Sequence, residues 1–218
     1  MVTFLFLRHG LSVTNNSGSF TGSLDVSLHE RGFTQANDVA KYLTSQKEYK
    51  IDKIYSSTSA RACQTVSPTA TALGLEIEKS KLLQEIYLGN WEGMTFVQVE
   101  KQFPEAFQIF RDNVGLARYG DGENTAEAQA RFVKAVEDIA KTNENKTVLI
   151  ATHGAVLRAL YCKWSGISLE ELKNVPIVPN ASISVAKFEN GKGTFEIYGF
   201  DDYLSDKTPH NPNYKNLT

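Results

Sequence analysis

The sequence predicts an α/β fold, a three-layer sandwich in which a mainly parallel sheet has helices on both faces and a β-hairpin near its C-terminal end. Short apolar runs alternate with longer segments of helical periodicity through most of the 218 residues. Two of these runs, in FLFLRHG at residues 4–10 and in VLIATHG at residues 148–154, lead into a His-Gly pair. Such runs, bounded by turn residues, are typical of buried parallel strands.

Six segments are predicted to be strands, since each combines a short apolar run or an alternating pattern with flanking turn signals. The last two are joined by ENGKG, in which Asn190-Gly191 is a strong signal for a hairpin turn. The predicted strands are residues 3–7, 51–56, 76–79, 147–151, 182–188 and 194–198.

The first helix is predicted to start near Leu28, because Ser27 and Glu30 match the S-x-x-E pattern of a capping box. Apolar residues then recur with the helical period, which predicts a face that packs against the sheet. That face is expected to consist of Phe33, Ala36, Val39, Ala40 and Leu43.

Three further helices follow from the same periodicity. Residues 60–73 have a helical pattern that ends at Gly74, a residue type suited to the turn after a helix. Residues 124–141 repeat the period, and residues 155–164 follow the second His-Gly pair.

One domain is expected over residues 1–205, followed by a polar tail over residues 206–218. Residues 92–122 are expected to form a small helical cap after Glu85. Six aromatic residues are predicted to form the core of this cap, with one or two of them lining an apolar wall. They are Trp91, Phe96, Phe103, Phe107, Phe110 and Tyr119.

Composition and charge limit the classes of partner. The formal charge of −2 and the pI near 6.1 predict no nucleic-acid partner and no attraction to an anionic membrane. No apolar run approaches the ~20 residues of a membrane-spanning helix, and the first one stops at Arg8, so a cytoplasmic location is expected. Cys63 and Cys162 lack the spacing of metal ligands and are interpreted as small core residues.

Positive charge gathers where the two apolar runs end. Arg8 and His9 follow the first run, and His153 follows the second at the start of a helix. Ligands of parallel sheets bind beyond the carboxyl ends of the strands, so His9 and His153 are expected to meet if their strands are neighbours. The helix opened by Gly154 would add free N–H groups, and Arg8 can hold phosphate oxygens in a bidentate fork. The sequence therefore predicts a phosphate site.

Five motifs in this sequence resemble those of the histidine phosphatase superfamily, which includes cofactor-dependent phosphoglycerate mutases and relatives of the acid phosphatases. The motifs come in the family's order, and the resemblance runs from about residue 3 to residue 188. RHG alone is weak evidence, but the five together are specific. They are LRHG near the N-terminus, SSTSARACQT at residues 56–65, LQEIYLGNWEGMT at residues 83–95, GENTAEAQARF, and THGAVLRAL.

A phosphohistidine mechanism accounts for these residue types. A neutral imidazole is a competent nucleophile toward phosphorus, and His9 is assigned this role. Arg8, Arg61 and His153 would stabilise charge on the transferring phosphoryl oxygens. Glu85 would protonate the leaving alkoxide and then deprotonate the attacking water. No metal and no cofactor is expected.

The resemblance also implies weaker candidates for substrate binding. Asn15 fits the family's RHG-x-x-x-x-N spacing and is expected to bind the phosphate or to orient His9. Thr21 and Gly22 lie in FTGSLD, which resembles the family's loop facing the substrate. Gly154 is a further candidate for substrate binding, through its backbone N–H group.

Two positions depart from the family pattern. Leu11 stands where Glu or Gln is common, and His29 stands where Thr usually starts the following helix. Leu11 is expected to change only how the loop is braced. Ser27 is expected to cap the helix in place of the usual Thr. His29 itself, like His210 in the tail, is interpreted as solvated.

A phosphatase is favoured over a phosphoglycerate mutase because only about thirty residues separate Glu92 from Glu123. The mutases resembled here carry a considerably longer basic insertion in that region.

A phospho-ligand-binding protein without turnover is a third reading, and a zinc site is a disfavoured fourth. The expected partner is a small-molecule phosphate monoester, and a homo-oligomer is possible. Arg111 and Arg118 are interpreted as solvated, although either could reach a substrate carboxylate.

Overall fold

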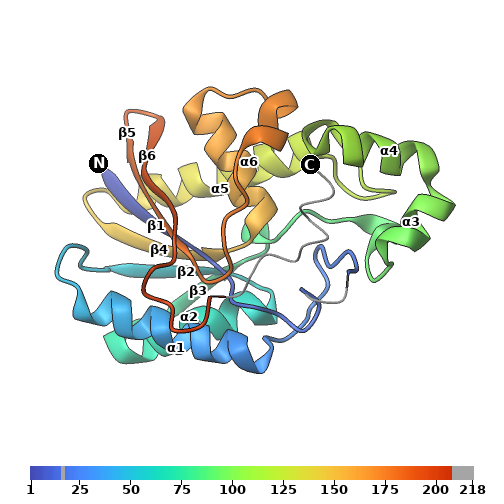
Figure 1. Cartoon of the computed structure of the whole chain (residues 1–218). Coiled ribbons are helices and arrows are strands. Elements are labelled where there is room, and N and C mark those ends of the chain that lie inside the picture. Colours follow the sequence, from blue (N-terminus) through green and yellow to red (C-terminus); the bar gives the residue numbers. More distant parts are fainter. Residues whose placement is uncertain (16–17, 208–218) are drawn as a thin grey trace.

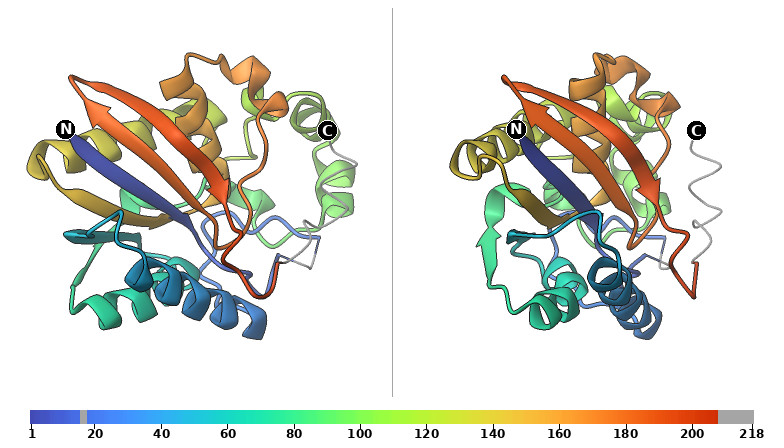
Figure 2. Two further views of the ribbon diagram at one scale, coloured as in Figure 1. Left: turned by 60° about the vertical axis from the view of Figure 1, so that its left-hand side comes forward. Right: turned by 90° about the vertical axis from the view of Figure 1, so that its left-hand side faces the viewer.

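The computed structural model describes residues 1–15 and 18–207, and its centre is a mixed sheet. The strand order in the sheet is β3-β2-β4-β1-β5-β6. Strands β3, β2, β4 and β1 run parallel, whereas β5 and β6 form an antiparallel hairpin beside β1 (Figure 2). The strands are β1 Val2–Arg8, β2 Lys53–Ser57, β3 Ile77–Ser80, β4 Thr147–Thr152, β5 Ile183–Glu189 and β6 Lys192–Phe200.

Helices cover both faces of this sheet, which confirms the three-layer sandwich (Figure 1). Helices α1 and α2 lie on one face and α5 and α6 on the other, while the short helices α3 and α4 lie to one side. Four 3-10 turns complete the regular structure of the described residues. The helices are α1 Glu30–Ser45, α2 Ala60–Leu73, α3 Phe96–Gln102, α4 Pro104–Asp112, α5 Thr125–Thr142 and α6 Gly154–Ser165, with the turns η1 Lys81–Leu83, η2 Gly89–Trp91, η3 Val114–Leu116 and η4 Leu169–Asn174.

Alternation along β1 and β4 divides the core in two. Successive side chains of a strand point to opposite faces, so Phe4 and Phe6 pack toward α5 and α6 with Ile150. Leu5 and Leu7 belong to the other cluster, which lies against α1 and α2. Because both faces of these two strands are buried, their continuous apolar runs were readable as parallel strands.

The start of α1 differs from the prediction. The helix begins at Glu30, and its N-cap is His29, whose Nδ1 accepts a hydrogen bond from the backbone N–H of Arg31. The Ser27 hydroxyl donates instead to Oε1 of Gln64 at 3.1 Å, so the predicted capping box and replacement cap are wrong. Phe33 is also wrong as a core residue, since it lies on the first turn at the edge of the apolar face and is 44% exposed.

An aromatic cluster fills the segment after Glu85, as the sequence predicts. Trp91 is fully buried, and the rings of Phe103, Phe107, Phe110 and Tyr119 lie around it. Phe20, from a loop about seventy residues earlier, enters the same cluster, with its ring centroid 4.7 Å from that of Phe96. No local pattern connects Phe20 to this segment, so this contact was not predictable from the sequence.

The two cysteines and Asp206, the first residue of the predicted tail, have structural surroundings. Cys162 is buried and Cys63 is half-buried, and both are free thiols. Asp206 binds the guanidinium of Arg31 in a bidentate ion pair, which fixes the start of the predicted tail against α1. Residues 208–218 of that tail, His210 among them, lie outside the described residues.

Candidate active site

The two histidines meet at the carboxyl ends of neighbouring strands. Strands β1 and β4 pair in parallel register, with Arg8 opposite Thr152. The backbone N–H of His9 donates to the carbonyl of Thr152 at 2.9 Å. His9 and His153 therefore follow the ends of the two strands side by side. The centroids of the His9 and His153 rings are 5.2 Å apart, and both side chains are buried. This is the juxtaposition that the two sequence motifs predict.

The His9 ring is held in one orientation with one tautomer. Its Nδ1 lies 2.7 Å from the carbonyl oxygen of Gly10, which can only accept, so Nδ1 carries the proton and Nε2 keeps a lone pair. Burial lowers the pKa of His9 well below 6.5, and the nearby charges of Arg61 and Arg8 lower it further. The imidazole is therefore neutral, and Nε2 presents an unprotonated lone pair.

Asn180 braces the loop that carries His9, and the sequence did not point to it. Its Nδ2 group donates to the carbonyls of His9 at 3.0 Å and Gly10 at 3.3 Å. The backbone N–H of Ala181 donates to the same His9 carbonyl at 3.1 Å. Asn180 follows Pro179 in an irregular segment, where no periodicity or motif marks it.

Two arginines flank the histidines, Arg61 fully buried and Arg8 half-buried. Arg61, on the first turn of α2, is 1% exposed and donates to the carbonyls of Gly22 and Leu24 at 2.7 Å each. Its Nε is buried without a hydrogen-bond partner among the described residues. Arg8 donates to the carbonyl of Val178. Burial lowers the pKa of the Arg61 guanidinium, although the carboxylates of Glu85 and of a nearby aspartate oppose the shift.

Glu85 lies at the N-terminus of α6. Its Oε2 accepts from the backbone N–H of Ala155 at 3.0 Å, and its Oε1 accepts from that of Val156 at 3.1 Å. The positive end of the helix dipole favours a carboxylate at this place. The same helix begins with Gly154, directly after His153, so the structure brings Glu85 to the end of the sheet where both histidines lie.

Gly154 leaves room for an arginine side chain. A Cβ at this position would lie 3.0 Å from Nε of Arg8, tighter than ordinary contacts allow. The glycine therefore permits Arg8 to cross the first turn of α6, beside the N–H groups that the sequence analysis singled out.

The loop with Asn15, Thr21 and Gly22 is braced from several sides. Oδ1 of Asn15 accepts from the backbone N–H of Ser12 at 2.8 Å, and Oγ1 of Thr21 donates to that of Thr14 at 2.8 Å. Gly22 has a φ of +50°, which favours glycine, and its carbonyl accepts from Arg61. Asn15 thus turns its side-chain oxygen toward its own loop.

Leu11 is a core residue of this loop. Its side chain is 1% exposed, and its backbone N–H donates to Oε1 of Gln35 on α1 at 2.8 Å. The bracing therefore comes from Gln35, and the side chain of Leu11 contributes only packing.

A half-buried ion pair holds the segment that carries Glu85, and no sequence pattern pointed to it. Arg131 on α5 binds Glu123 through Nε at 2.6 Å and Nη2 at 2.8 Å. Its remaining N–H groups donate to the carbonyls of Leu82, Gln84 and Glu85. The resemblance covers GENTAEAQARF, which contains both partners, but sequence spacing alone cannot show that an arginine bridges back to another segment.

The two exposed arginines near the aromatic cluster form ion pairs. Arg111 lies 3.3 Å from Oε1 of Glu100, and Arg118 lies 2.7 Å from Oε1 of Glu127. Both side chains are about half exposed, as expected for solvated charges. Among the described residues, no three His, Cys, Asp or Glu side chains are grouped so that they could hold a metal ion.

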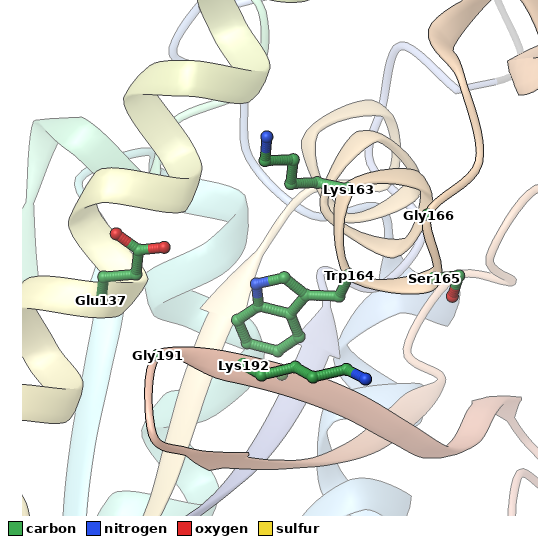
Figure 3. A pocket seen from close by; sticks show the side chains of 8 residues that line it. Glu137, Lys163, Trp164, Ser165, Gly166, Gly191 and Lys192 are labelled. Atoms are coloured by element: carbon green, nitrogen blue, oxygen red, sulfur yellow. The ribbon is translucent and has the colours of Figure 1, made fainter.

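A separate hollow of about 390 Å³ lies between α5, α6 and the turn of the β5–β6 hairpin (Figure 3). Trp164 forms one wall, with Glu137, Lys163 and Lys192 around it. The hairpin turn adjoins Phe188, which pairs with Val2 at the amino end of β1. The hollow is therefore at the opposite end of the sheet from His9.

We expect both buried histidines to make stability depend on pH. Their folded pKa values lie well below 6.5, so below pH 6.5 the unfolded chain binds protons that the folded chain does not. The free energy of unfolding should fall as pH drops from 7 toward 5, by at most about 1.4 kcal/mol per pH unit for each histidine. Urea denaturation of wild type and His9→Gln across pH 5 to 8 measures this, and an unchanged slope in the variant would contradict it.

The fold and the paired histidines are those expected of a phosphatase class of enzyme. A family model described as the histidine phosphatase superfamily (branch 1) matches residues 4–201. This chain belongs to that superfamily.

Individual relatives agree with this assignment. Phosphoserine phosphatase 1 of Hydrogenobacter thermophilus is 33% identical over 87% of this chain and 88% of its own length. The metal-independent phosphoserine phosphatase of Arabidopsis thaliana is 29% identical over 92% of this chain and 82% of its own length. A 2,3-bisphosphoglycerate-dependent phosphoglycerate mutase of Streptococcus pneumoniae is also 29% identical, over 87% of this chain and 94% of its own.

The solved structure of Bacillus stearothermophilus YhfR superposes with a TM-score of 0.88. It is 29% identical and covers 94% of this chain and all of its own. The chain is thus a histidine phosphatase in fold and family. Among the described residues, no helix is long and apolar enough to cross a membrane.

Proposed function

We propose that this chain is a metal-independent phosphomonoester hydrolase that acts through a phosphohistidine on a small phosphorylated metabolite. The observation that carries the proposal is the state of His9, a neutral ring with a lone pair on Nε2 close to the guanidinium groups of Arg8 and Arg61. A nucleophile in that state can attack phosphorus without first losing a proton. The cations then stabilise the negative charge of the phosphoryl group.

In the first step, Nε2 of His9 forms a bond to phosphorus while the bond from phosphorus to the ester oxygen breaks. Arg8, Arg61 and His153 hold the equatorial oxygens, and Glu85, which enters this step as the carboxylic acid, gives its proton to the leaving alkoxide. For that transfer the carboxyl group must exchange a backbone N–H of α6 for the leaving oxygen. The N–H groups of Ala155 and Val156 fix its resting position.

In the second step, water attacks the phosphohistidine, and the bond between nitrogen and phosphorus breaks. Glu85 accepts a proton from this water, which returns the carboxyl group to its starting state and releases inorganic phosphate. Asn15, Thr21, Gly22 and Gly154 complete the substrate site in this proposal, through the loop after β1 and the first turn of α6. Roles for these residues stay predictions until variants are measured.

Phosphoserine is the substrate we propose within this class, because two of the relatives above are phosphoserine phosphatases. The short segment between Glu92 and Glu123 favours hydrolysis over mutase action, since it leaves few groups to shield a phosphoenzyme from water. A cytoplasmic location, a single domain over residues 1–205 and a possible homo-oligomer also stay predictions.

The test is release of inorganic phosphate from phosphoserine in excess EDTA, beside 3-phosphoglycerate and p-nitrophenyl phosphate. We expect turnover in EDTA, with kcat/KM highest for phosphoserine. Bisphosphate-dependent isomerisation of 3-phosphoglycerate that exceeds hydrolysis would favour the mutase instead. Phosphate binding without turnover of any ester would show a binding protein.

A further inference from the structure

Ser57 lies at the end of β2 with its hydroxyl against the second histidine. Strand β2 is the neighbour of β4, so its last residue reaches the place where His153 follows β4. The Oγ of Ser57 is 2.8 Å from Nε2 of His153, and both side chains are fully buried. The contact is therefore shielded from water.

The other ring nitrogen of His153 is the one left for a ligand. Nδ1 is buried and has no hydrogen-bond partner among the described residues. Buried polar groups without a partner are rare in folded proteins and call for an explanation such as a ligand. Since Nε2 faces Ser57 and the ring packs beside His9, Nδ1 is the atom available to a phosphoryl oxygen.

We propose that Ser57 is a positioning residue that fixes the His153 imidazole as the Nδ1–H tautomer, so that a donor faces the phosphoryl group. This inference rests on the proposed function, because it assigns the use of His153 within that site. A neutral ring has one N–H, and which nitrogen carries it is set by the partner of the other.

The hydrogen bonds of Ser57 support this direction of donation. Its Oγ accepts from the backbone N–H of Ser59 at 3.2 Å and has one proton to give. The two acceptors for that proton are Nε2 of His153 at 2.8 Å and Oγ of Ser59 at 3.3 Å. The shorter distance and the stronger acceptor favour the histidine.

The opposite tautomer conflicts with the ligand. If Nε2 carried the proton and donated to Ser57, Nδ1 would turn a lone pair toward an anionic phosphoryl oxygen, which repels it. Burial lowers the pKa of His153 well below 6.5, with Arg61 as the largest charge effect, so in the empty site the ring is neutral and its tautomer matters.

The two histidines then share one tautomer and use it in opposite ways. His9 directs its Nδ1–H at the carbonyl of Gly10 and offers the lone pair of Nε2. His153 directs its Nε2 lone pair at Ser57 and offers Nδ1–H. One ring attacks phosphorus, and the other stabilises the oxygen charge that the attack creates.

The experiment reads the tautomer directly. Protein labelled with ¹⁵N-histidine is examined by NMR at pH 7.5, with and without inorganic phosphate, and His153→Gln assigns the signals. Two-bond couplings between ring protons and nitrogens show which nitrogen carries the proton. We expect Nδ1–H on His153 in the wild type and a shift toward Nε2–H in Ser57→Ala.

Kinetics and a matched variant complete the test. We expect Ser57→Ala to lower kcat for p-nitrophenyl phosphate by roughly 10- to 100-fold, the usual effect of removing an orienting partner. Ser56→Ala is the control, because Ser56 is equally buried but donates to the carbonyl of Ser57 and does not contact His153. It should keep both the tautomer and kcat.

Either of two results would overturn the inference: Nε2–H on His153 in the wild type, or Nδ1–H that persists in Ser57→Ala. The tautomer is readable even if the wild-type protein hydrolyses no ester. Failure of the proposed function is therefore distinguishable from failure of the role of Ser57.

Discussion

His9→Ala should lose turnover almost completely, with kcat for p-nitrophenyl phosphate lower by roughly 10⁵- to 10⁶-fold, as is typical when a covalent nucleophile is removed. The reason is that Nε2 of His9 forms the bond to phosphorus in the first step and is the leaving group in the second. Without it, water must attack the ester directly in a site that holds the phosphate but lacks the nucleophile. Phosphate release is measured in excess EDTA from pH 5 to pH 8.

The control for this variant is His29→Ala, which removes another imidazole, at the start of α1, and should keep wild-type turnover. Rapid acid-free quenching with labelled substrate should also detect a phosphoenzyme in the wild type and none in His9→Ala. If His9→Ala kept more than about one-hundredth of wild-type kcat, His9 would not be the nucleophile.

Arg61→Lys should lower kcat/KM by roughly 10³-fold, within the range known for arginines that stabilise a transferring phosphoryl group. Lysine keeps the positive charge but not the planar fork. Its single ammonium cannot bind the carbonyls of Gly22 and Leu24 and also present a donor where Nε of Arg61 now lies. The loop and the phosphate would then compete for one group.

Steady-state kinetics on phosphoserine and on p-nitrophenyl phosphate measure this loss. Arg111→Lys is the matched control, since Arg111 makes an exposed ion pair and should tolerate the change with less than a twofold effect, as such pairs contribute little. A loss below tenfold in Arg61→Lys would show that charge alone suffices at this position.

Sequence patterns predicted the features that local chemistry determines. The apolar run of β1 and the His-Gly motifs predicted His9 and His153 at the carboxyl ends of two strands, and the structure shows that these strands are neighbours. Glu85 and Arg61 came from motif resemblance, and the structure brings them to the same end of the sheet. The hairpin followed from Asn190-Gly191, which has the positive φ values that such a turn needs.

Contacts between distant segments were not predictable in the same way. Asn180 and Arg131 act on backbone carbonyls, which carry no side-chain signature in a sequence. Phe20 joins an aromatic cluster built by residues far along the chain. His29 caps α1 through a ring nitrogen. Known N-cap preferences favour hydroxyls and carboxylates instead, and so pointed to the hydroxyl of Ser27.

Phe20 connects the aromatic cluster of the cap to the loop that holds Arg61. Its ring is part of the aromatic cluster of the cap, and two residues later Gly22 offers its carbonyl to Arg61. We therefore expect a change in the aromatic interior of the cap to shift the Gly22 carbonyl and, through it, the guanidinium of Arg61.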